Sequence, residues 1–526
     1  MKLQTGKTQT RKKSVPPIIP FVALIVVFTI ISIRYSQKNV SHETKSPSFF
    51  DGSSDNALAV TNHAEAGQEP CNDCNGESQT SPSETAEDKT SFVTETVVEA
   101  MPRGHADEGA VIPVNDNNNG RVVKVGPRKR SRRRSRRRQR RRDSTLTAKR
   151  NVTRTEGNDG VKALALEVAG TREGGSCDLF SGEWVVNPEG PYYTNVTCDW
   201  AIQEHQNCMK FGRPDTGFLK WRWKPDGCEL PVFDPNRFLE LVRGKSLAFV
   251  GDSVARNHMQ SLLCLLSSVA RPLDVSTSTD ENFKRWEYRE YDFNVSIFWS
   301  PYLVRTERTD PNDVTRPFNL FLDEFDESWT TQIQTFDFVI ISAGHWFSRP
   351  TFFYLNGTLV GCQYCPQSNV SHLPSSFSYR NAFRTAFRAI NGAEGFHGVT
   401  FLRTFAPSHF ENGRWDRGGD CVRTRPFSRG EKALDDYNLE YYRIQLEELR
   451  NAQREGRRKG VKLRLFDATL LMLLRPDGHP GKYGRWPDGK VSVPNDCVHW
   501  CLPGPIDSWN DFLAELIRRE AAVIRN

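Results

Sequence analysis

A short apolar run that ends in Gly251-Asp252-Ser253 constrains the fold of this chain more than any other feature. Residues Lys245 to Val250 read KSLAFV, which is typical of a buried strand, and residues 254–269 have the apolar spacing of a buried helix. A strand, a tight glycine turn and a helix place Ser253 at a helix N-terminus. Backbone N–H groups at such a terminus can stabilise a developing oxyanion.

Further apolar runs and one long helix extend this pattern into a sheet. The helix is predicted over Gly430 to Gly460, where leucines and tyrosines recur every three to four residues. Buried strands that alternate with helices favour an α/β fold, in which helices cover both faces of a mostly parallel sheet. Ligand sites in such sheets form beyond the carboxyl ends of the strands, and Ser253 follows one of these ends. The other predicted strands are Phe336 to Ser342, Val399 to Thr404 and Leu463 to Asp467.

A second motif near the C-terminus supplies the groups that could activate Ser253. It reads Asp496-Cys497-Val498-His499-Trp500-Cys501. A serine hydroxyl is a weak nucleophile until an imidazole removes its proton, and a carboxylate fixes the imidazole tautomer that can do so. Asp496 and His499 are three residues apart, so one turn can bring both side chains to one side. The two motifs together predict a Ser-His-Asp site for acyl transfer.

The N-terminal region predicts a membrane anchor. Val15 to Ile33 contains nineteen residues without a charge, enough to cross a hydrocarbon core of roughly 30 Å as a helix. Five basic residues precede this run, so residues 1–14 are predicted to be a cytoplasmic tail and residues 15–34 a type II signal anchor with a lumenal remainder. A cleaved signal peptide is the alternative, but the run is long for one and no small-residue cleavage site follows it.

Residues 35–172 have few aromatic residues and no sustained apolar period, which predicts a disordered lumenal stem. The stem contains an Arg-rich tract, residues 128–142, in which twelve of fifteen residues are basic. Without those charges the formal net charge of +7 becomes −5, so the alkaline character belongs to the tract. In a lumen, acidic polysaccharides or lipid headgroups are its expected contacts and nucleic acid is not; an extended solvated spacer is the alternative. Cys71 and Cys74, also in the stem, suggest a local or interchain disulfide more than a metal site.

The cysteines and the glycosylation motifs are consistent with a lumenal body. All twelve cysteines follow the predicted anchor, where they would be oxidised. The ordered part is predicted over residues 173–526, and its first section, Cys177 to Pro235, is rich in cysteine and tryptophan and predicts a smaller disulfide-pinned lobe. Candidate N-glycosylation sites are Asn39, Asn151, Asn195, Asn294, Asn356 and Asn369.

At this level of detail the chain resembles the plant trichome birefringence-like proteins. The resemblance spans the ordered region, does not cover the stem, and rests on several motifs together. The most specific are Gly251 to Asn257, followed by Ser261 to Cys264, and the terminal block Asp496 to Asn510. The connecting matches are Cys198-Asp199-Trp200, Gly212 to Asp215, Trp221-Arg222-Trp223, Leu230-Pro231, Arg243-Gly244-Lys245, Gly344-His345-Trp346 and Asp477 to Pro480.

This resemblance implies a Golgi type II membrane enzyme that O-acetylates cell-wall polysaccharides such as xylan, mannan, xyloglucan or pectin. It also implies a three-layer αβα fold similar to the GDSL/SGNH esterases. On that basis Ser253 is the nucleophile, His499 the base and Asp496 its partner, while Arg256 and Asn257 shape the oxyanion site or bind the acetyl donor. The implied disulfides are Cys177 with Cys228, Cys198 with Cys264, Cys208 with Cys501 and Cys421 with Cys497, which leaves Cys362 and Cys365 as a local pair.

Several other residues have two interpretations. Gly344 could supply an oxyanion N–H, and His345 could line the cleft or be a packed loop histidine. Trp346 and Trp500 could stack on acceptor sugars, although burial is the commoner fate of tryptophan. The residues around Gly344 depart from the family pattern at Ser342-Ala343 and Phe347, which affects acceptor contacts and not the triad. A zinc site at Cys497, His499 and Cys501 fits no common ligand spacing, so no metal is expected.

Three classes of function are compatible with the sequence. The first is an acetyltransferase that forms an acetyl-serine intermediate and uses a co-substrate such as acetyl-CoA, with no bound cofactor. The second is a lumenal acetylesterase with the same triad. The third is a non-catalytic protein that bridges wall polysaccharides, with the Arg-rich tract bound to pectin. Transfer and hydrolysis differ in water access and acceptor binding, which the sequence does not disclose.

Overall fold

The computed structural model describes residues 159–169, 177–310, 316–486 and 494–525. The predicted cytoplasmic tail and anchor, the Arg-rich tract, Cys71, Cys74, Asn39 and Asn151 lie outside these ranges and stay predictions. Within the ranges, no helix combines the length and the apolar character that a membrane crossing requires.

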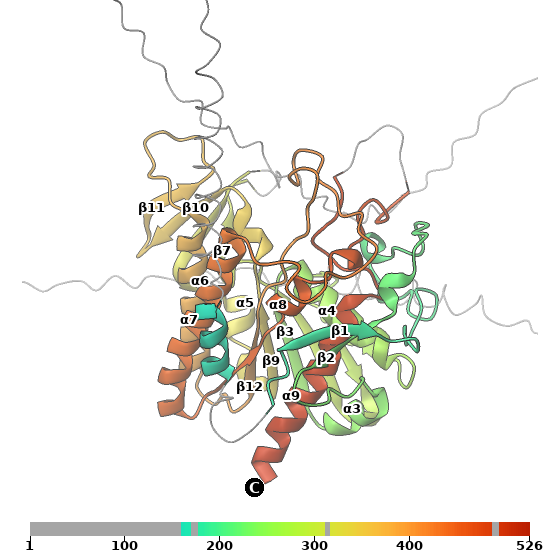
Figure 1. Ribbon diagram of the computed structural model, residues 1–526. Coiled ribbons are helices and arrows are strands. Elements are labelled where there is room, and N and C mark those ends of the chain that lie inside the picture. The colour runs from blue at the N-terminus through green and yellow to red at the C-terminus, as the bar shows by residue number, and fades with distance from the viewer. Residues whose placement is uncertain (1–158, 170–176, 311–315, 487–493, 526) are drawn as a thin grey trace, which may run out of the picture. The chain divides into compact units, whose positions relative to one another are not determined.

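A seven-stranded sheet forms the centre of the described region (Figure 1). Its strand order is β13-β12-β9-β3-β6-β5-β4, and the five strands from β13 to β6 are parallel. The strands β5 and β4 continue the sheet in antiparallel orientation. The predicted, mostly parallel sheet is therefore present. Its strands are β3 (Ser246–Gly251), β4 (Leu273–Asp274), β5 (Arg285–Tyr288), β6 (Phe293–Trp299), β9 (Phe338–Ser342), β12 (Val399–Arg403) and β13 (Lys462–Phe466).

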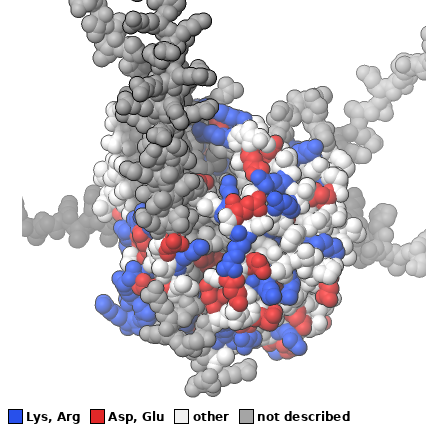
Figure 2. Space-filling model, viewed as in Figure 1, with Lys and Arg blue, Asp and Glu red and all other residues white. Residues whose placement is uncertain are grey.

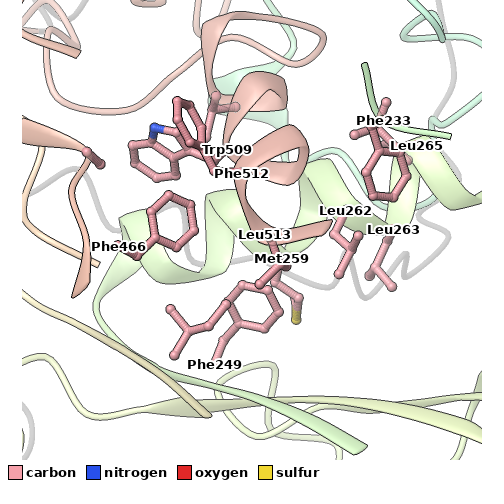
Figure 3. Close-up of a cluster of buried hydrophobic side chains, with 14 of the residues drawn as sticks. Phe233, Phe249, Met259, Leu262, Leu263, Leu265, Phe466, Trp509, Phe512 and Leu513 are labelled. Carbon is pink, nitrogen blue, oxygen red and sulfur yellow. The ribbon is translucent and has the colours of Figure 1, made fainter. Parts of the chain in front are cut away.

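Strand β3 shows how the sheet separates two hydrophobic cores. Leu247 and Phe249 point into one core with α4 and α9, whereas Ala248 and Val250 point into the other with α6 and α7. Figure 3 shows the first core, where Phe249 from β3 faces side chains of α4 and α9. This is the three-layer arrangement that the sequence predicts. The helices are α3 (Pro235–Leu241), α4 (Ser253–Leu266), α5 (Glu327–Thr330), α6 (Ser375–Gly392), α7 (Asp436–Lys459), α8 (Thr469–Met472) and α9 (Ser508–Arg525).

Helix α7 begins later than the predicted Gly430 because Asp435 caps it. The Asp435 carboxylate accepts a hydrogen bond from the Asn438 N–H, and Gly460 ends the helix in a left-handed conformation with φ 76°.

Two smaller sheets flank the central one. Strands β1 (Gly182–Val186) and β2 (Trp221–Pro225) form an antiparallel pair in the cysteine-rich lobe. A four-stranded sheet, in the order β11-β10-β8-β7, was not predicted. Its strands mix buried with partly or fully exposed residues, so they lack the continuous apolar runs that predict β3, β9, β12 and β13. Strands β4, β5 and β6 of the central sheet were not predicted either. The bounds are β7 (Val304–Arg308), β8 (Phe318–Phe325), β10 (Thr351–Leu355) and β11 (Thr358–Gln363).

A helix over residues 159–169 corrects the predicted extent of the disordered stem, which was placed at residues 35–172. Val161, Ala165 and Val168 are buried in the core of α6 and α7. The Val168 carbonyl accepts a hydrogen bond from Gln453, and Glu167 pairs with Arg450 of α7. The apolar stripe of this helix spans only two turns, too short to stand out in a polar segment.

The five disulfides of the described region include the four that the resemblance implies. They join Cys177 to Cys228, Cys198 to Cys264, Cys208 to Cys501 and Cys421 to Cys497, and the fifth joins Cys362 to Cys365. The cysteine-rich lobe is thus tied to α4 through Cys264 and to the C-terminal motif through Cys501.

The candidate glycosylation sites differ in accessibility. Asn356 and Asn369 are exposed, Asn195 is half-buried in a turn, and Asn294 lies half-buried within strand β6. On the face seen in Figure 2, basic and acidic side chains are interspersed. This agrees with the expectation that the excess of basic residues belongs to the Arg-rich tract and not to the folded body.

Gly251 is required where β3 turns into α4. Its φ is 155°, and a Cβ there would lie 1.7 Å from the Ser342 carbonyl oxygen on β9. Because that oxygen belongs to a paired strand, it cannot move away at low cost. A side chain at residue 251 would therefore push apart the two strands that end beneath the candidate nucleophile.

We expect Gly251→Ala to lower the free energy of unfolding by about 3 kcal/mol or more, through backbone strain and overlap. Gly357→Ala is the matched control, because Gly357 also has a positive φ, 69°, but no atom lies within 4 Å of the position that a Cβ would take there. That control should cost only about 1 kcal/mol. Urea unfolding of the full-length protein measures both, and equal losses would contradict this role for Gly251.

Candidate active site

Asp252 connects the start of α4 to the loop after β9. One carboxylate oxygen accepts the Val254 N–H at 3.0 Å and caps the helix, and the other accepts the Gly344 N–H at 3.0 Å. Asp252 is buried, so both bonds are shielded from water. The carboxylate therefore fixes the position of Ser253, the first residue of α4, relative to the neighbouring strand end.

The structure brings the three predicted triad residues together. His499 Nε2 lies 2.7 Å from Ser253 Oγ, and His499 Nδ1 lies 2.8 Å from Asp496 Oδ2. The other Asp496 oxygen accepts the backbone N–H groups of Val498 and His499 at 3.1 and 2.9 Å. With the proton on Nδ1, the imidazole can accept the serine proton at Nε2.

The charge state of Asp496 suits this arrangement. Burial by itself would raise the pKa of Asp496, but His499, through its charge and its hydrogen bonds, lowers the pKa below the usual range of a carboxyl. Asp496 is therefore ionised at neutral pH and can stabilise an imidazolium on His499.

Asn257 holds the segment that carries His499. Its side-chain oxygen accepts the Trp500 N–H at 2.8 Å, and its amide donates to the Trp500 carbonyl at 3.3 Å. The side chain is fully buried. Asn257 was predicted to contact the oxyanion or the acetyl donor; the structure shows its side chain bonded to the Trp500 backbone instead, which is a positioning role.

Gly344 also differs from its predicted role. Its N–H donates to Asp252 and is therefore not directed at an oxyanion. Arg256, the third member of this predicted group, lies over the Trp299 ring at 4.7 Å and reaches Asn282 at 3.3 Å. Its charge acts on His205, which places it near the triad. Of the three residues predicted for the oxyanion or the donor, Arg256 is thus the one that remains a candidate for the oxyanion.

His205 is a site residue that sequence reasoning missed. It lies in η1 (Glu204–Gln206) of the cysteine-rich lobe, and its ring packs edge-on against the His499 ring at 4.8 Å. Burial, followed by the charge of His499, lowers the pKa of His205 to about 3. A neutral ring can cover the base without opposing its protonation. No spacing or motif relates residue 205 to residue 499, so only tertiary structure could reveal this contact.

The three residues predicted to contact the acceptor are mostly buried. Trp500 is fully buried and Trp346 is 8% exposed, so neither presents a face to a sugar ring. Trp346 packs edge-on against Trp299, Tyr302 and Phe318. His345 is half-buried and its Nε2 lies 3.0 Å from the Ala406 carbonyl, in agreement with its packed-loop interpretation.

The zinc alternative is wrong. Cys497 and Cys501 belong to two different disulfides, which leaves neither thiolate for a metal. Two further sets among the described residues have candidate ligand atoms within 4.8 Å of one another: Cys362, Cys365 and His372, whose cysteines form a disulfide, and His205, Asp496 and His499. Both ring nitrogens of His499 are already engaged by Ser253 and Asp496, so this set is a hydrogen-bonded triad with a covering histidine.

The two disulfides beside His499 should matter for activity. Replacing Cys421 and Cys497 together by serine should lower kcat by roughly 10-fold or more, because the segment of His499 loses one of its fixed points and small displacements are costly. The matched control replaces Cys362 of β11 and Cys365, which form a disulfide outside the triad, and should leave kcat near the wild-type value. Equal losses in both variants would show that the effect is on folding alone.

Two family models and several known proteins match this chain. The GDSL/SGNH-like acyl-esterase family found in Pmr5 and Cas1p, PC-Esterase, matches residues 230–516, and the PMR5 N terminal domain matches residues 175–229. Protein trichome birefringence-like 19 of Arabidopsis thaliana is 58% identical over 352 residues, which cover 66% of this chain and 82% of that protein. Xyloglucan O-acetyltransferase 3 of Populus trichocarpa is 45% identical over 349 residues, 66% of this chain and 86% of that protein. The chain therefore belongs to the PC-Esterase family and, within it, to the trichome birefringence-like proteins.

Proposed function

We propose that this protein is an O-acetyltransferase that moves an acetyl group from a donor, through Ser253, to a hydroxyl of a cell-wall polysaccharide. The observation that carries the proposal is the continuous hydrogen-bond chain from Ser253 through His499 to Asp496 at the carboxyl end of a central strand.

The first half-reaction forms an acetyl-serine. As Ser253 Oγ attacks the acetyl carbonyl, His499 Nε2 takes the hydroxyl proton, and Asp496 stabilises the resulting imidazolium. The carbonyl π electrons move to its oxygen. When the tetrahedral intermediate collapses, the donor leaves with the electron pair of its bond to the acetyl group, and His499 returns the proton to it. If acetyl-CoA is the donor, the leaving group is its thiol.

The second half-reaction transfers the acetyl group to the acceptor. A sugar hydroxyl attacks the acetyl-serine while His499 takes its proton, and the proton then passes to Ser253 Oγ as the ester bond breaks. The enzyme returns to its starting state with one ester broken and one formed.

The oxyanion would be held at the helix terminus. Of the first four amides of α4, those of Val254, Ala255 and Arg256 donate to Asp252. We therefore assign the Ser253 N–H to the oxyanion of the reacting carbonyl, with the Arg256 guanidinium, one turn on, as a second source of positive charge.

Xyloglucan is the first acceptor to test. Support comes from relatives that carry this activity in their names, at 45% and 44% identity. Xylan, mannan and pectin remain the other acceptors of the proposal.

The alternative function is acetylesterase activity, which the acyl-esterase description of the family favours. Water in place of a sugar hydroxyl would complete the same cycle as hydrolysis, so the two functions differ in what occupies the acceptor position.

The proposed location is the Golgi membrane, with a signal anchor over residues 15–34 and the body in the lumen. The five disulfides support an oxidising compartment. In that location the Arg-rich tract would contact acidic polysaccharides. In the third, non-catalytic class of function, this contact would be the whole function, without acetyl transfer or hydrolysis.

The test incubates the full-length protein with acetyl-CoA and xyloglucan, xylan, mannan and pectin oligosaccharides, and follows the mass of each acceptor. We expect acetylation of xyloglucan, and a loss of roughly 10⁴-fold or more in Ser253→Ala because the nucleophile is removed. Ser268→Ala, an exposed serine just beyond the same helix, is the matched control and should retain activity.

Three results would count against the transferase. Equal acetylation by the Ser253→Ala variant would refute a serine intermediate. Deacetylation of acetylated oligosaccharides without transfer would establish the esterase. Retention on pectin with neither reaction, lost when residues 128–142 are deleted, would establish the bridging function.

A further inference from the structure

Two buried histidines outside the triad contact each other and the backbone of His499. His409 follows β12, and His479 follows η6 (Pro476–Gly478). His409 Nδ1 lies 2.7 Å from His479 Nε2. The outer nitrogens face carbonyl oxygens: His409 Nε2 lies 2.9 Å from that of Leu473, and His479 Nδ1 lies 2.7 Å from that of His499.

Counting protons shows what this chain of contacts requires. A carbonyl oxygen only accepts, so both outer nitrogens must carry a proton. Two neutral imidazoles have two protons in all, and both are then used at the outer contacts. The inner nitrogens would face each other with lone pairs at 2.7 Å, which is repulsive. Three simultaneous hydrogen bonds would therefore need three protons, and the pair as a whole would then carry one positive charge.

The proposal follows from this count and rests on the proposed function. We propose that His409 and His479 share one proton and, in that state, act as positioning residues that hold the backbone carbonyl of the catalytic base His499.

The surroundings set two opposing demands on that proton. Burial, the largest influence, disfavours the charge and lowers the pKa of both rings, whereas the contacts to the Leu473 and His499 carbonyls favour it. A single extra proton shared by the two rings satisfies both carbonyls while burying one charge and not two, so the pair titrates as a unit. The charged groups that act on it are Arg213 and Lys432, which oppose the proton, and Glu411, Asp477 and Asp496, which favour it.

Loss of the shared proton should break the hydrogen bond to the His499 carbonyl and keep the one to the Leu473 carbonyl. With two N–H protons left on the pair and one of them between the rings, only one of these two carbonyls still has a donor. The Leu473 contact is buried and cannot be replaced by water, whereas the His499 contact is only partly buried. His479 also stacks on Trp500, with ring centroids 4.1 Å apart, so a shift of its ring disturbs the residue after the base.

The test measures how fast a fluorophosphonate probe labels Ser253 in the full-length protein across pH. Labelling reports the assembled triad without an acceptor, so it separates this inference from the acetyltransferase proposal. In the wild type we expect a bell-shaped profile: the rate rises as His499 loses its proton and falls as the histidine pair loses its shared proton.

Two variants give the decisive comparison. His409→Gln keeps an N–H for Leu473 and removes the inner contact, so a neutral His479 can hold His499 at any pH; the alkaline fall should disappear and the maximum should stay within about 3-fold of wild type. His479→Leu removes the donor to His499, and the rate should drop by roughly 10-fold at every pH.

His397→Gln changes an exposed histidine and should keep the wild-type profile. An alkaline fall that persists unchanged in His409→Gln would overturn the proposal, as would labelling of His479→Leu at the wild-type rate. If His479→Leu does not melt cooperatively, the profile of His409→Gln alone decides. Normal labelling without acetyl transfer to any glycan would instead reject the proposed function and leave this inference standing.

Discussion

The fixation of residues 496–501 is the constraint on which the rest of the site depends. This segment, which carries Asp496 and His499, belongs to no helix or strand, and the hydrogen bonds from Asp496 to Val498 and His499 order it locally without placing it against Ser253. Its position comes from distant contacts: a buried asparagine of α4 bonded to both polar groups of the Trp500 backbone, and two disulfides. The Cys208–Cys501 disulfide closes a sequence separation of 293 residues. Ordering such a loop is costly, and these covalent and buried bonds offset that cost.

The cysteine-rich lobe therefore contributes to the site itself. It provides Cys208, the histidine that covers the base, and a carbonyl of Gln206 that accepts the Leu502 N–H. Arg213 of the same lobe donates to the His479 carbonyl at 2.7 Å. Since the lobe corresponds to the PMR5 N terminal domain and the sheet to the PC-Esterase domain, the two family matches describe parts of one site. A catalytic domain without the lobe would lack the support behind its base.

The parts of the structure that could be predicted are those encoded locally. The strand, glycine turn and helix around Ser253 follow from a continuous apolar run and a helical period. Strands β3, β9, β12 and β13 lie within a residue or two of their predicted ends, whereas β4, β5 and β6 of the same sheet were not predicted. The pairing of cysteines came from resemblance, because spacing alone leaves many connectivities open.

What could not be predicted depends on tertiary contacts. Asn257 and Gly344 looked suited to an oxyanion because they flank the nucleophile, but their hydrogen bonds are made to Trp500 and Asp252. His205 has no local signal at all. Whether Trp500 faces solvent or core depends on residues hundreds of positions away.

The central claim is that Ser253 carries the acetyl group between donor and acceptor. The most direct measurement is peptide mass spectrometry of the full-length protein, quenched in acid after incubation with isotopically labelled acetyl-CoA. The account predicts labelled acetyl on the peptide that contains Ser253, removed when xyloglucan oligosaccharides are added before the quench. Transfer of label to the oligosaccharide with no acetyl on Ser253 at any time would contradict it.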